Sequence, residues 1–402
     1  MTRVGIQAKG KDAFSAHHQD ARRELVRALA AKRPDALAAW LKTHRLQAAD
    51  LTWLQQQGLA SFGFYRLQEA ELLDNLPADM VSQWQAIYYE TSVTSATLDW
   101  ETERILTALA QAGMKFIWLK GAALAYTVYP NPACRGRGDL DLWLPLDQWP
   151  QAITTLEGFG YRVYIKENRP PALVHLTGGE QKMIASAHLR LVELQWPAMR
   201  GEWIRRTTAI DHVGIWERAT PIALHGIPPV HVMTPEDTLI HLSVHQAINH
   251  HFSSPWLRNL LDIHLLVAHY DLDWQALVTR AREWRLATVV WTVLSLAQRL
   301  LDTAVPAGCL ERLAPSPLRR RLMEPLHLER ALIEMWPGGY QRRRFLIQLL
   351  LGDRLRDMAR LLWRGVYPEA AWLRARYGVE TGRSLWRVRL AHVGQLATSA
   401  RV

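Results

Sequence analysis

Apolar side chains recur every three or four residues through the first part of the chain. Leu25, Leu29 and Leu37 show this spacing, and Leu51 and Leu54 continue it. Side chains at such intervals share one face of a helix. The pattern up to about residue 103 therefore predicts a helical region, which we interpret as a cap or a scaffold.

The first strand-like runs lie in the middle of the chain. Gly226, Pro228 and Pro229 predict a turn near the end of this part. The whole mixture predicts an α/β or α+β unit that extends to about residue 230. The predicted strands are residues 115–119, 139–144, 161–165, 189–196, 211–217 and 220–224, and the predicted helices are 122–128 and 146–159.

A helix start follows at Thr234–Asp237. It places Thr at the N-cap, Pro at the first helical position and two acids in the first turn, where they face the positive end of the helix dipole. Helical spacing then continues to the end of the chain, with a break near residues 253–255. We predict three parts: an N-terminal helical region (1–104), a central core (105–230) and a C-terminal helical domain (231–402).

Length and composition fit a globular protein of several parts. The chain has 402 residues, of which 49% are apolar. No apolar run approaches the roughly 20 residues that span a bilayer, and the first residues lack the apolar segment of a signal peptide, so we expect a cytoplasmic location without a transmembrane segment. Cys134 and Cys309 lie far apart. They show no spacing typical of a zinc site or a disulfide framework.

The net charge of +10 is concentrated at the C-terminal end. Residues 318–402 hold 17 Arg, no Lys and 7 acidic residues, whereas residues 1–317 hold 31 basic and 31 acidic residues. Within this part, residues 354–364 place leucines on one side of a helix and arginines on the other. This pattern is typical of binding to nucleic acid or to an anionic membrane surface. It is also typical of a helix docked on a core with its Arg stems at the margin.

Two aspartates, Asp139 and Asp141, stand one residue apart in an apolar strand. Residues i and i+2 of a strand face the same side, ~6–7 Å apart, so both carboxylates share one face while Leu140 and Leu142 face the core. Two like charges held together repel each other unless a cation lies between them. Carboxylate oxygens of this kind suit Mg²⁺. In the alternative, Asp139 is a turn residue and Asp141 pairs with an arginine at a sheet edge.

A strand–glycine–helix junction precedes the aspartates. The apolar strand ends at Lys120-Gly121, and a helix begins at Ala122. Glycine allows a ligand to approach the backbone closely, and the free N–H groups at a helix start can bind phosphate. Many α/β proteins use such a junction for packing alone.

A third acid, Glu193, lies in the apolar half of another predicted strand. If that strand lies beside the strand of the aspartates, three carboxylates converge on a site for two metal ions, which can support an in-line displacement. Lys120, Arg135 and Arg137 would then supply the positive charge that a triphosphate needs.

These motifs resemble those of the DNA polymerase β-like nucleotidyltransferase superfamily: a strand ending in Gly, a helix, Asp-x-Asp on a strand and a later strand acid. More specifically, the chain resembles a family of uncharacterised nucleotidyltransferases. The resemblance rests on Leu119–Ala125, Arg135–Leu142 and Val192–Trp196, and it continues at Thr234–Leu242, His250–Phe252, Leu257–Ile263, Tyr367–Glu369 and Leu373–Tyr377.

The resemblance implies an α+β fold in which a mixed sheet with helices carries the metal site and is flanked by N-terminal and C-terminal helical regions. It implies that Asp139, Asp141 and Glu193 are the metal ligands, for two Mg²⁺ ions or for Mn²⁺ in their place. It also implies that Lys120, Gly121, Ala122 and Arg135 lie at the nucleotide phosphates, to which we add Arg137.

The chain departs from the family pattern at three points. Gly121 is followed by Ala122 where Gly-Gly or Gly-Ser is usual, so backbone N–H groups must bind the phosphate without a hydroxyl. Gln195 precedes Trp196 where the family often has His. The third acid, Glu193, is longer than the usual Asp by one methylene.

Four histidines, His241, His245, His250 and His251, gather in the C-terminal domain. His241 and His245 are one helical turn apart, but no acid stands where an HExxH metal site needs one. We interpret the group as a substrate contact or a polar seam between domains, and its role stays open. Asp262, inside an apolar helix, is expected to pair with Arg258 or with a histidine.

The sequence thus predicts a Mg²⁺-dependent nucleotidyltransferase that moves a nucleoside monophosphate from an NTP to an acceptor hydroxyl and releases pyrophosphate. The acceptor is a small molecule, a peptide, a saccharide or RNA. One alternative is a toxin-like enzyme that modifies tRNA or other RNA, because such enzymes carry a similar arrangement. The other is a non-catalytic nucleotide-binding or scaffold protein with the same fold. The base of the NTP and the oligomeric state stay open.

Overall fold

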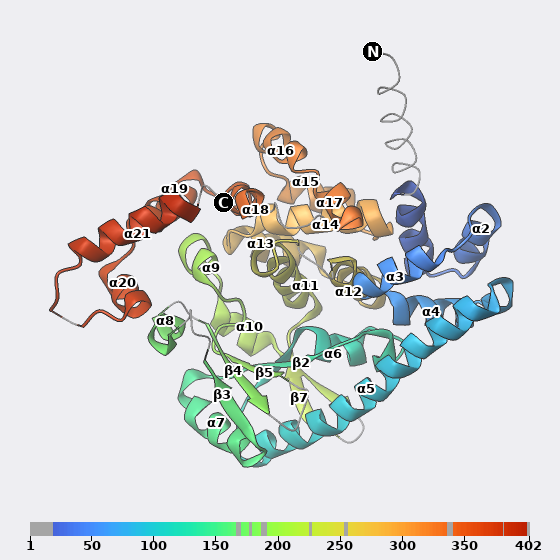
Figure 1. Ribbon diagram of the computed structural model, residues 1–402, viewed down its shortest axis with the longest axis horizontal. Helices are drawn as coiled ribbons and strands as arrows, with labels where there is room; N and C mark the ends of the chain where they lie inside the picture. Colours follow the sequence, from blue (N-terminus) through green and yellow to red (C-terminus); the bar gives the residue numbers. More distant parts are fainter. Residues whose placement is uncertain are drawn as a thin grey trace.

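The computed structural model contains a seven-stranded mixed sheet, and most of the N-terminal and C-terminal helices pack on each other above it (Figure 1). The predicted α+β class, with a mixed sheet and helical regions at both ends of the chain, is confirmed. None of the described helices combines the length and the apolar character that a membrane span requires. The structure describes residues 19–165, 170–176, 179–185, 191–224, 227–252, 256–335, 341–380 and 382–399.

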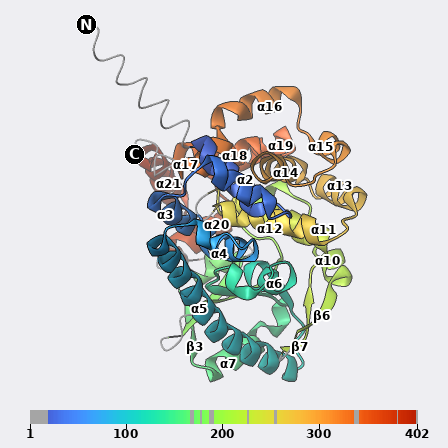
Figure 2. The ribbon, with the colours of Figure 1, turned by 90° about the vertical axis from the view of Figure 1, so that its right-hand side faces the viewer.

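The N-terminal region consists of helices that end in one very long helix. That helix, α5, has 34 residues, so it extends about 50 Å and reaches from the other N-terminal helices along the sheet (Figures 1 and 2). The helices are 19–30, α2 (Asp35–Thr43), α3 (Ala48–Gln56), α4 (Ala60–Glu69) and α5 (Ala78–Gln111), with the 3₁₀ turn Leu73–Asn75 before α5.

The sheet has the strand order β3-β4-β5-β2-β1-β7-β6. The pairs β2/β5 and β1/β7 are parallel, and the other four pairs are antiparallel. The strands are β1 (Ile117–Leu119), β2 (Asp139–Trp143), β3 (Tyr161–Tyr164), β4 (Glu180–Ala185), β5 (Leu191–Gln195), β6 (Thr220–Leu224) and β7 (Ile227–Val232).

The two faces of the central strands differ in chemistry. Leu140 and Leu142 of β2, with Val192 and Leu194 of β5, are fully buried in a core that includes side chains of α5 and of α7. The alternate residues point to the opposite face, which the C-terminal helices approach (Figure 1). The apolar residues therefore anchor the strands, and the polar residues between them are presented on the other face.

Helices connect the strands and form the C-terminal region. Thr234 caps α11 with its hydroxyl, which accepts a hydrogen bond from the N–H of Asp237, as the sequence predicts. The connecting helices are α6 (Lys120–Thr127), α7 (Trp149–Gly158), α8 (Pro171–Leu176), α9 (Glu202–Thr207) and α10 (His212–Arg218), with short 3₁₀ turns at Pro132–Cys134 and Leu146–Gln148.

The C-terminal helices follow α11 without a further strand among the described residues. A π-helical turn, His245–Asn249, extends the end of α11. They are α11 (Pro235–Val244), α12 (Trp256–His269), α13 (Trp274–Glu283), α14 (Ala287–Leu301), α15 (Ala307–Leu313), α16 (Pro317–Met323), the turn Glu324–Leu326, α17 (Leu328–Glu334), α18 (Gln341–Leu350), α19 (Leu355–Val366), α20 (Ala370–Tyr377) and α21 (Trp386–Ser399).

Three local predictions need correction. The strand predicted at residues 211–217 is wrong, because Asp211 accepts a hydrogen bond from the N–H of Gly214 and so caps helix α10. Strand β4 was not predicted, since charged side chains alternate along it. Strand β7 occupies part of the segment that the prolines marked as a turn; its pairing with β1 is made at His231, beyond both prolines. Gly226, also predicted to lie in that turn, is outside the described residues.

The domain boundaries predicted at residues 104/105 and 230/231 stay predictions. Each falls inside an element, the first within α5 and the second within β7. Helix α5 contributes to the core beneath the sheet through Ile105, Leu106 and Leu109.

Candidate functional site

The three predicted acids meet on the polar face of the sheet. Strands β2 and β5 run parallel with Asp141 directly opposite Glu193, and Asp139 lies two residues before Asp141 on the same face. One carboxylate oxygen from each of the three residues lies within 4.8 Å of the others. Asp141 and Glu193 are buried, whereas Asp139 is accessible to solvent. This convergence is what a site for a divalent cation requires.

Lys120 points its ammonium group at these acids. Its Nζ lies 2.5 Å from Oδ1 of Asp141 and 3.7 Å from Oε2 of Glu193. Lys120 is the first residue of α6 and adopts a φ of +56°, a conformation that is uncommon for a side chain other than glycine. The turn from β1 into α6 thus delivers a buried cation to the carboxylates. In the structure Lys120 forms ion pairs with Asp141 and Glu193. Its predicted contact with phosphate stays a prediction.

Two further cations hold Glu193. Its cross-strand neighbour on β4, Lys182, donates to Oε1, and the guanidinium of Arg200 lies 3.3 Å from Oε2. Burial alone would raise the pKa of Glu193, but the charges of Lys120, Arg200 and Lys182 outweigh it and lower the pKa below its usual range. Glu193 is therefore ionised and has most of its hydrogen-bonding capacity in use.

A fourth acid, Glu180, joins this cluster from the start of β4. It forms ion pairs with Arg200 and with Lys182, whose Nζ lies 3.6 Å from Oε1. Burial raises the pKa of Glu180, and the nearby charge of Glu193 adds to this effect. Sequence reasoning missed Glu180, Lys182 and Arg200. The signal was the alternation of Glu180 and Lys182, which marks one face of a strand.

Asp141 has the most buried carboxylate of the three predicted metal ligands. Burial raises its pKa, with contributions from the charges of Asp139 and Glu193, while Lys120 opposes the shift. The side-chain amide of Gln195 donates to Oδ1 of Asp141 at 2.6 Å. Gln195 occupies the position where the resembled family often has His, and here it orients the central carboxylate.

Gly121 is required by an arginine that packs against it. A Cβ atom at Gly121 would lie 2.0 Å from a terminal nitrogen of Arg135. That guanidinium cannot move aside easily, because it forms two hydrogen bonds of 2.7 Å with Asp262 on α12. The hydroxyl of Tyr129 donates to the same carboxylate at 2.7 Å. The partner of Asp262 is thus Arg135, where Arg258 or a histidine was expected.

Arg137 and Ala122 also lie in the interior. Arg137 forms an ion pair with Asp99 of α5, and its guanidinium stacks over the ring of Tyr126, 4.9 Å from the centroid. Ala122 is buried in the core beneath the sheet. Their predicted roles at the phosphates, like those of Gly121 and Arg135, stay predictions.

The histidines of α11 and the following π-helical turn lie within electrostatic reach of the site. Burial, and next the positive charge of Lys120, lower the pKa of His241 to about 3 and that of His250 to about 4. The pKa of His245 is lowered for the same two leading reasons. His245 and His250 are joined by a 2.9 Å hydrogen bond between their Nε2 atoms. These rings are therefore neutral near physiological pH.

The backbone around the histidines is unusual. His245 begins the π-helical turn, and His251 and Phe252 follow it with φ values of +52° and +55°. π-helical turns occur frequently at functional sites. His251 itself is turned to another partner, the side-chain amide of Gln348, 2.6 Å from its Nε2.

The carboxylates fit a divalent metal ion. Carboxylate oxygens of Asp139 and Asp141 lie within 4.8 Å of each other. No hydrogen bond or ion pair of the Asp139 carboxylate is found among the described residues. Glu193 completes the set, although Lys182 and Arg200 already bind it. Lys120 has its positive charge at oxygens of Asp141 and Glu193 that a metal ion would use, so the two cations would compete.

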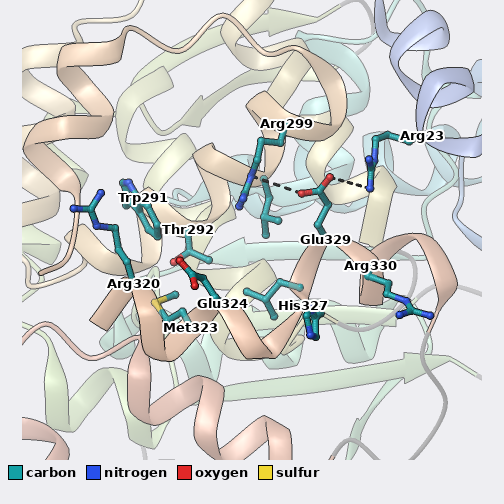
Figure 3. Close-up of a pocket in the computed structure, with 12 residues that line it drawn as sticks. Arg23, Trp291, Thr292, Arg299, Arg320, Met323, Glu324, His327, Glu329 and Arg330 are labelled. Atoms are coloured by element: carbon teal, nitrogen blue, oxygen red, sulfur yellow. Dashed lines mark ion pairs between the residues drawn. The ribbon is translucent and has the colours of Figure 1, made fainter. Parts of the chain in front are cut away.

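A cavity of about 550 Å³ lies elsewhere, between helix 19–30 and helices α14, α16 and α17. Figure 3 shows Glu329 between Arg23 and Arg299, with ion-pair distances of 3.2 and 3.8 Å. None of the described carboxylates of the sheet lines this cavity. Its volume is in the range of small-molecule sites, and four arginines and two glutamates line it.

Comparison with known proteins assigns most of this architecture to one family. The sequence model of a family described as "Uncharacterised nucleotidyltransferase" matches residues 37–302. The matched range covers more than half of the chain and contains the whole sheet and the histidines. It ends before the Arg-rich C-terminal helices, so the resemblance noted at Tyr367–Tyr377 lies outside it. No curated protein matches the chain.

Proposed function

Because the chain belongs to this family of uncharacterised nucleotidyltransferases, we propose that it transfers a nucleoside monophosphate from an NTP to an acceptor hydroxyl. The convergence of Asp139, Asp141 and Glu193 carries the proposal. In the reaction, the hydroxyl oxygen forms a bond to the α-phosphorus, and the bond from that phosphorus to the α,β-bridging oxygen breaks. The hydroxyl proton passes to a neutral imidazole of the site or to water, and pyrophosphate leaves with the electron pair of the broken bond.

Asp139 and Asp141 would hold Mg²⁺ or Mn²⁺, with Glu193 as the third ligand of a site for two ions. When bound, the metal supplies Lewis-acid stabilisation of the phosphoryl oxygens and lowers the pKa of the attacking hydroxyl. Gln195 keeps the carboxylate of Asp141 in one orientation through its 2.6 Å hydrogen bond. The accessible Asp139 is the ligand nearest to solvent and therefore to an entering substrate.

Lys120 and Arg200 would bind the triphosphate. Both lie at the acid cluster and carry charge that a triphosphate can neutralise. The backbone N–H groups of Gly121 and Ala122, at the start of α6, would add phosphate contacts. Arg135 and Arg137 support the site from the interior, through Asp262 and Asp99 respectively.

The neutral histidines would lie on the acceptor side. His250 is influenced by the charge of Asp139 as well as that of Lys120, so it is near the more accessible part of the site. A neutral imidazole can accept a hydrogen bond or a proton from an acceptor hydroxyl. The acceptor could be a small molecule, a peptide, a saccharide or RNA.

The test is release of pyrophosphate from each of the four NTPs, with Mg²⁺ and with pools of RNA, peptide and saccharide acceptors. We expect release by the wild type and a loss of about 100-fold or more in D139N and in D141N. D147N is the matched control, since Asp147 is an exposed acid just after the same strand. Equal activity, or equal silence, of all four proteins across every acceptor would contradict the proposal and favour a non-catalytic protein.

A further inference from the structure

Helix α19 exposes an apolar stripe on the side that faces away from the protein. Leu355, Leu362 and Val366 are 74%, 40% and 53% exposed, and they follow one another at intervals of seven and four residues. These intervals place them on one face of the helix. The other side of the helix is docked, because Met358 is buried and Leu361 packs against the main core. Packing within the chain therefore covers only part of the apolar surface of α19.

Helix α21 repeats the pattern. Trp386, Leu390 and Val393 are exposed and follow one another at intervals of four and three residues. The helix is fixed to α19 on another side, where Nε2 of His392 donates to the carbonyl of Gly365 at 2.9 Å. Figure 1 shows α19, α20 and α21 together at one side of the molecule. Isolated exposed apolar residues are ordinary, but an exposed apolar stripe on each of two neighbouring helices is a surface that needs a partner.

Arginines border both stripes. Arg356 and Arg360 are exposed next to the apolar face of α19, and Arg387 is exposed next to that of α21. No described carboxylate forms an ion pair with Arg360 or Arg387. Arg389 lies over the ring of Tyr367, 3.8 Å from the centroid, and brings its charge to the seam between the two helices. The partner of this surface must therefore be apolar in its interior and negatively charged at its border.

We propose that α19 and α21, which we call the C-terminal arm, bind the surface of an anionic lipid bilayer. The leucine and valine side chains would enter the boundary of the acyl chains, and the indole of Trp386 would lie at the level of the headgroups. The guanidinium groups would bind lipid phosphates. The arm would then lie in the plane of the membrane without crossing it.

Other partners fit the surface less well. RNA is bound through base stacking on aromatic or guanidinium groups, and it gives exposed leucines and valines nothing to pack against. A second copy of the chain would bury the apolar stripes, but it would also bring one set of arginines against another. Of these three partners, the bilayer alone satisfies both the aliphatic stripes and the positive border.

The experiment is flotation of the full-length protein with vesicles of phosphatidylcholine, alone or mixed with phosphatidylglycerol. We expect binding to the mixed vesicles, and binding about tenfold weaker or more in the double variant L362E/L390E. Both positions are exposed, so the fold should tolerate the changes, and a thermal melt checks this. The matched control is L318E, on α16, where Leu318 is 69% exposed; its binding should equal that of the wild type.

Three results would overturn the proposal. The first is absence of wild-type binding to the mixed vesicles. The second is equal binding by wild type and L362E/L390E. The third is tight binding of an RNA oligonucleotide that competes the protein off the vesicles and does not depend on Leu362 and Leu390. A dimer that dissociates in L362E/L390E, without any vesicle binding, would assign the arm to self-association.

Discussion

The polar face of the sheet and the C-terminal arm both collect positive charge, but they differ in what opposes it. On the sheet, Lys120, Lys182 and Arg200 each pair with buried carboxylates. On the arm, Arg360 and Arg387 border exposed apolar side chains and form no ion pair with a described carboxylate, whereas Arg356 lies 3.9 Å from Asp357. The family match contains the first region and ends before the second.

This difference separates two kinds of function. Burying charges is costly unless they are paired, and every cation named in the cluster on the sheet is paired with an acid. Under the proposed function, a metal ion would replace cations at the carboxylates, and a triphosphate would pair with the cations. Unopposed surface charge costs little and acts over the Debye length, so it suits recruitment to a large anionic partner. The polar face of the sheet therefore suits the proposed catalysis, and the C-terminal arm suits the proposed binding to a membrane surface.

Removing the buried ion pair between Arg135 and Asp262 should give the largest change in the free energy of unfolding. R135M leaves Asp262 buried without its bidentate partner, and we expect a loss of about 3–5 kcal/mol of unfolding free energy. Urea unfolding measures it. The double variant R135M/D262N should recover part of the loss, because it removes both charges. Normal stability of R135M with weakened NTP binding would instead make Arg135 a direct phosphate ligand.

The buried histidines should make the protein sensitive to mild acid. A histidine whose pKa is lowered on folding binds a proton in the unfolded chain that it does not bind in the native state. Stability is therefore complete above the ordinary pKa of 6.5 and is lost as the pH falls toward the native value, about 3 for His241. H241Q should reduce the dependence of unfolding free energy on pH by about 1.4 kcal/mol per pH unit between these values. An unchanged slope in urea titrations would contradict the assignment.

Competition between Lys120 and a metal ion is a finer test of the paired cluster. K120M removes the ammonium from the oxygens of Asp141, so Mn²⁺ should bind about tenfold more tightly. Titration calorimetry without nucleotide measures this. K115M is the control, because Lys115 is exposed just before β1. Weaker Mn²⁺ binding in K120M would mean that Lys120 organises the carboxylates instead of competing with the metal ion.

Much of the site could be predicted from the sequence, because its strongest signals are local. The Asp-x-Asp alternation assigns both acids to one face, and the apolar run around Glu193 marks a strand that can pair with it. The cap at Thr234 is equally local, and it is confirmed. The α+β class follows from the change of hydrophobic period along the chain, and it too is confirmed.

The rest depends on contacts between distant residues. Arg135 and Asp262 are separated by 127 positions, and nothing local indicates that they meet or that Gly121 makes room for them. Strand β4 was not predicted, because its alternating charged residues Glu180 and Lys182 are typical of an exposed segment. In the structure they pair with charged residues at the site, and β4 pairs with β5. The segment of α10 shows the opposite error: a strand was predicted where a helix forms. The N-cap at Asp211 favours the helix.

Nucleotidyl transfer at the carboxylate cluster is the central claim, and the position of a radioactive phosphorus tests it most directly. The protein would be incubated with Mg²⁺, an acceptor pool and each NTP labelled at either the α- or the γ-phosphorus. We predict that the α label becomes attached to an acceptor and that the γ label leaves in pyrophosphate, with both events lost in D141N. Transfer of the γ label, or label transfer that survives in D141N, would contradict the account.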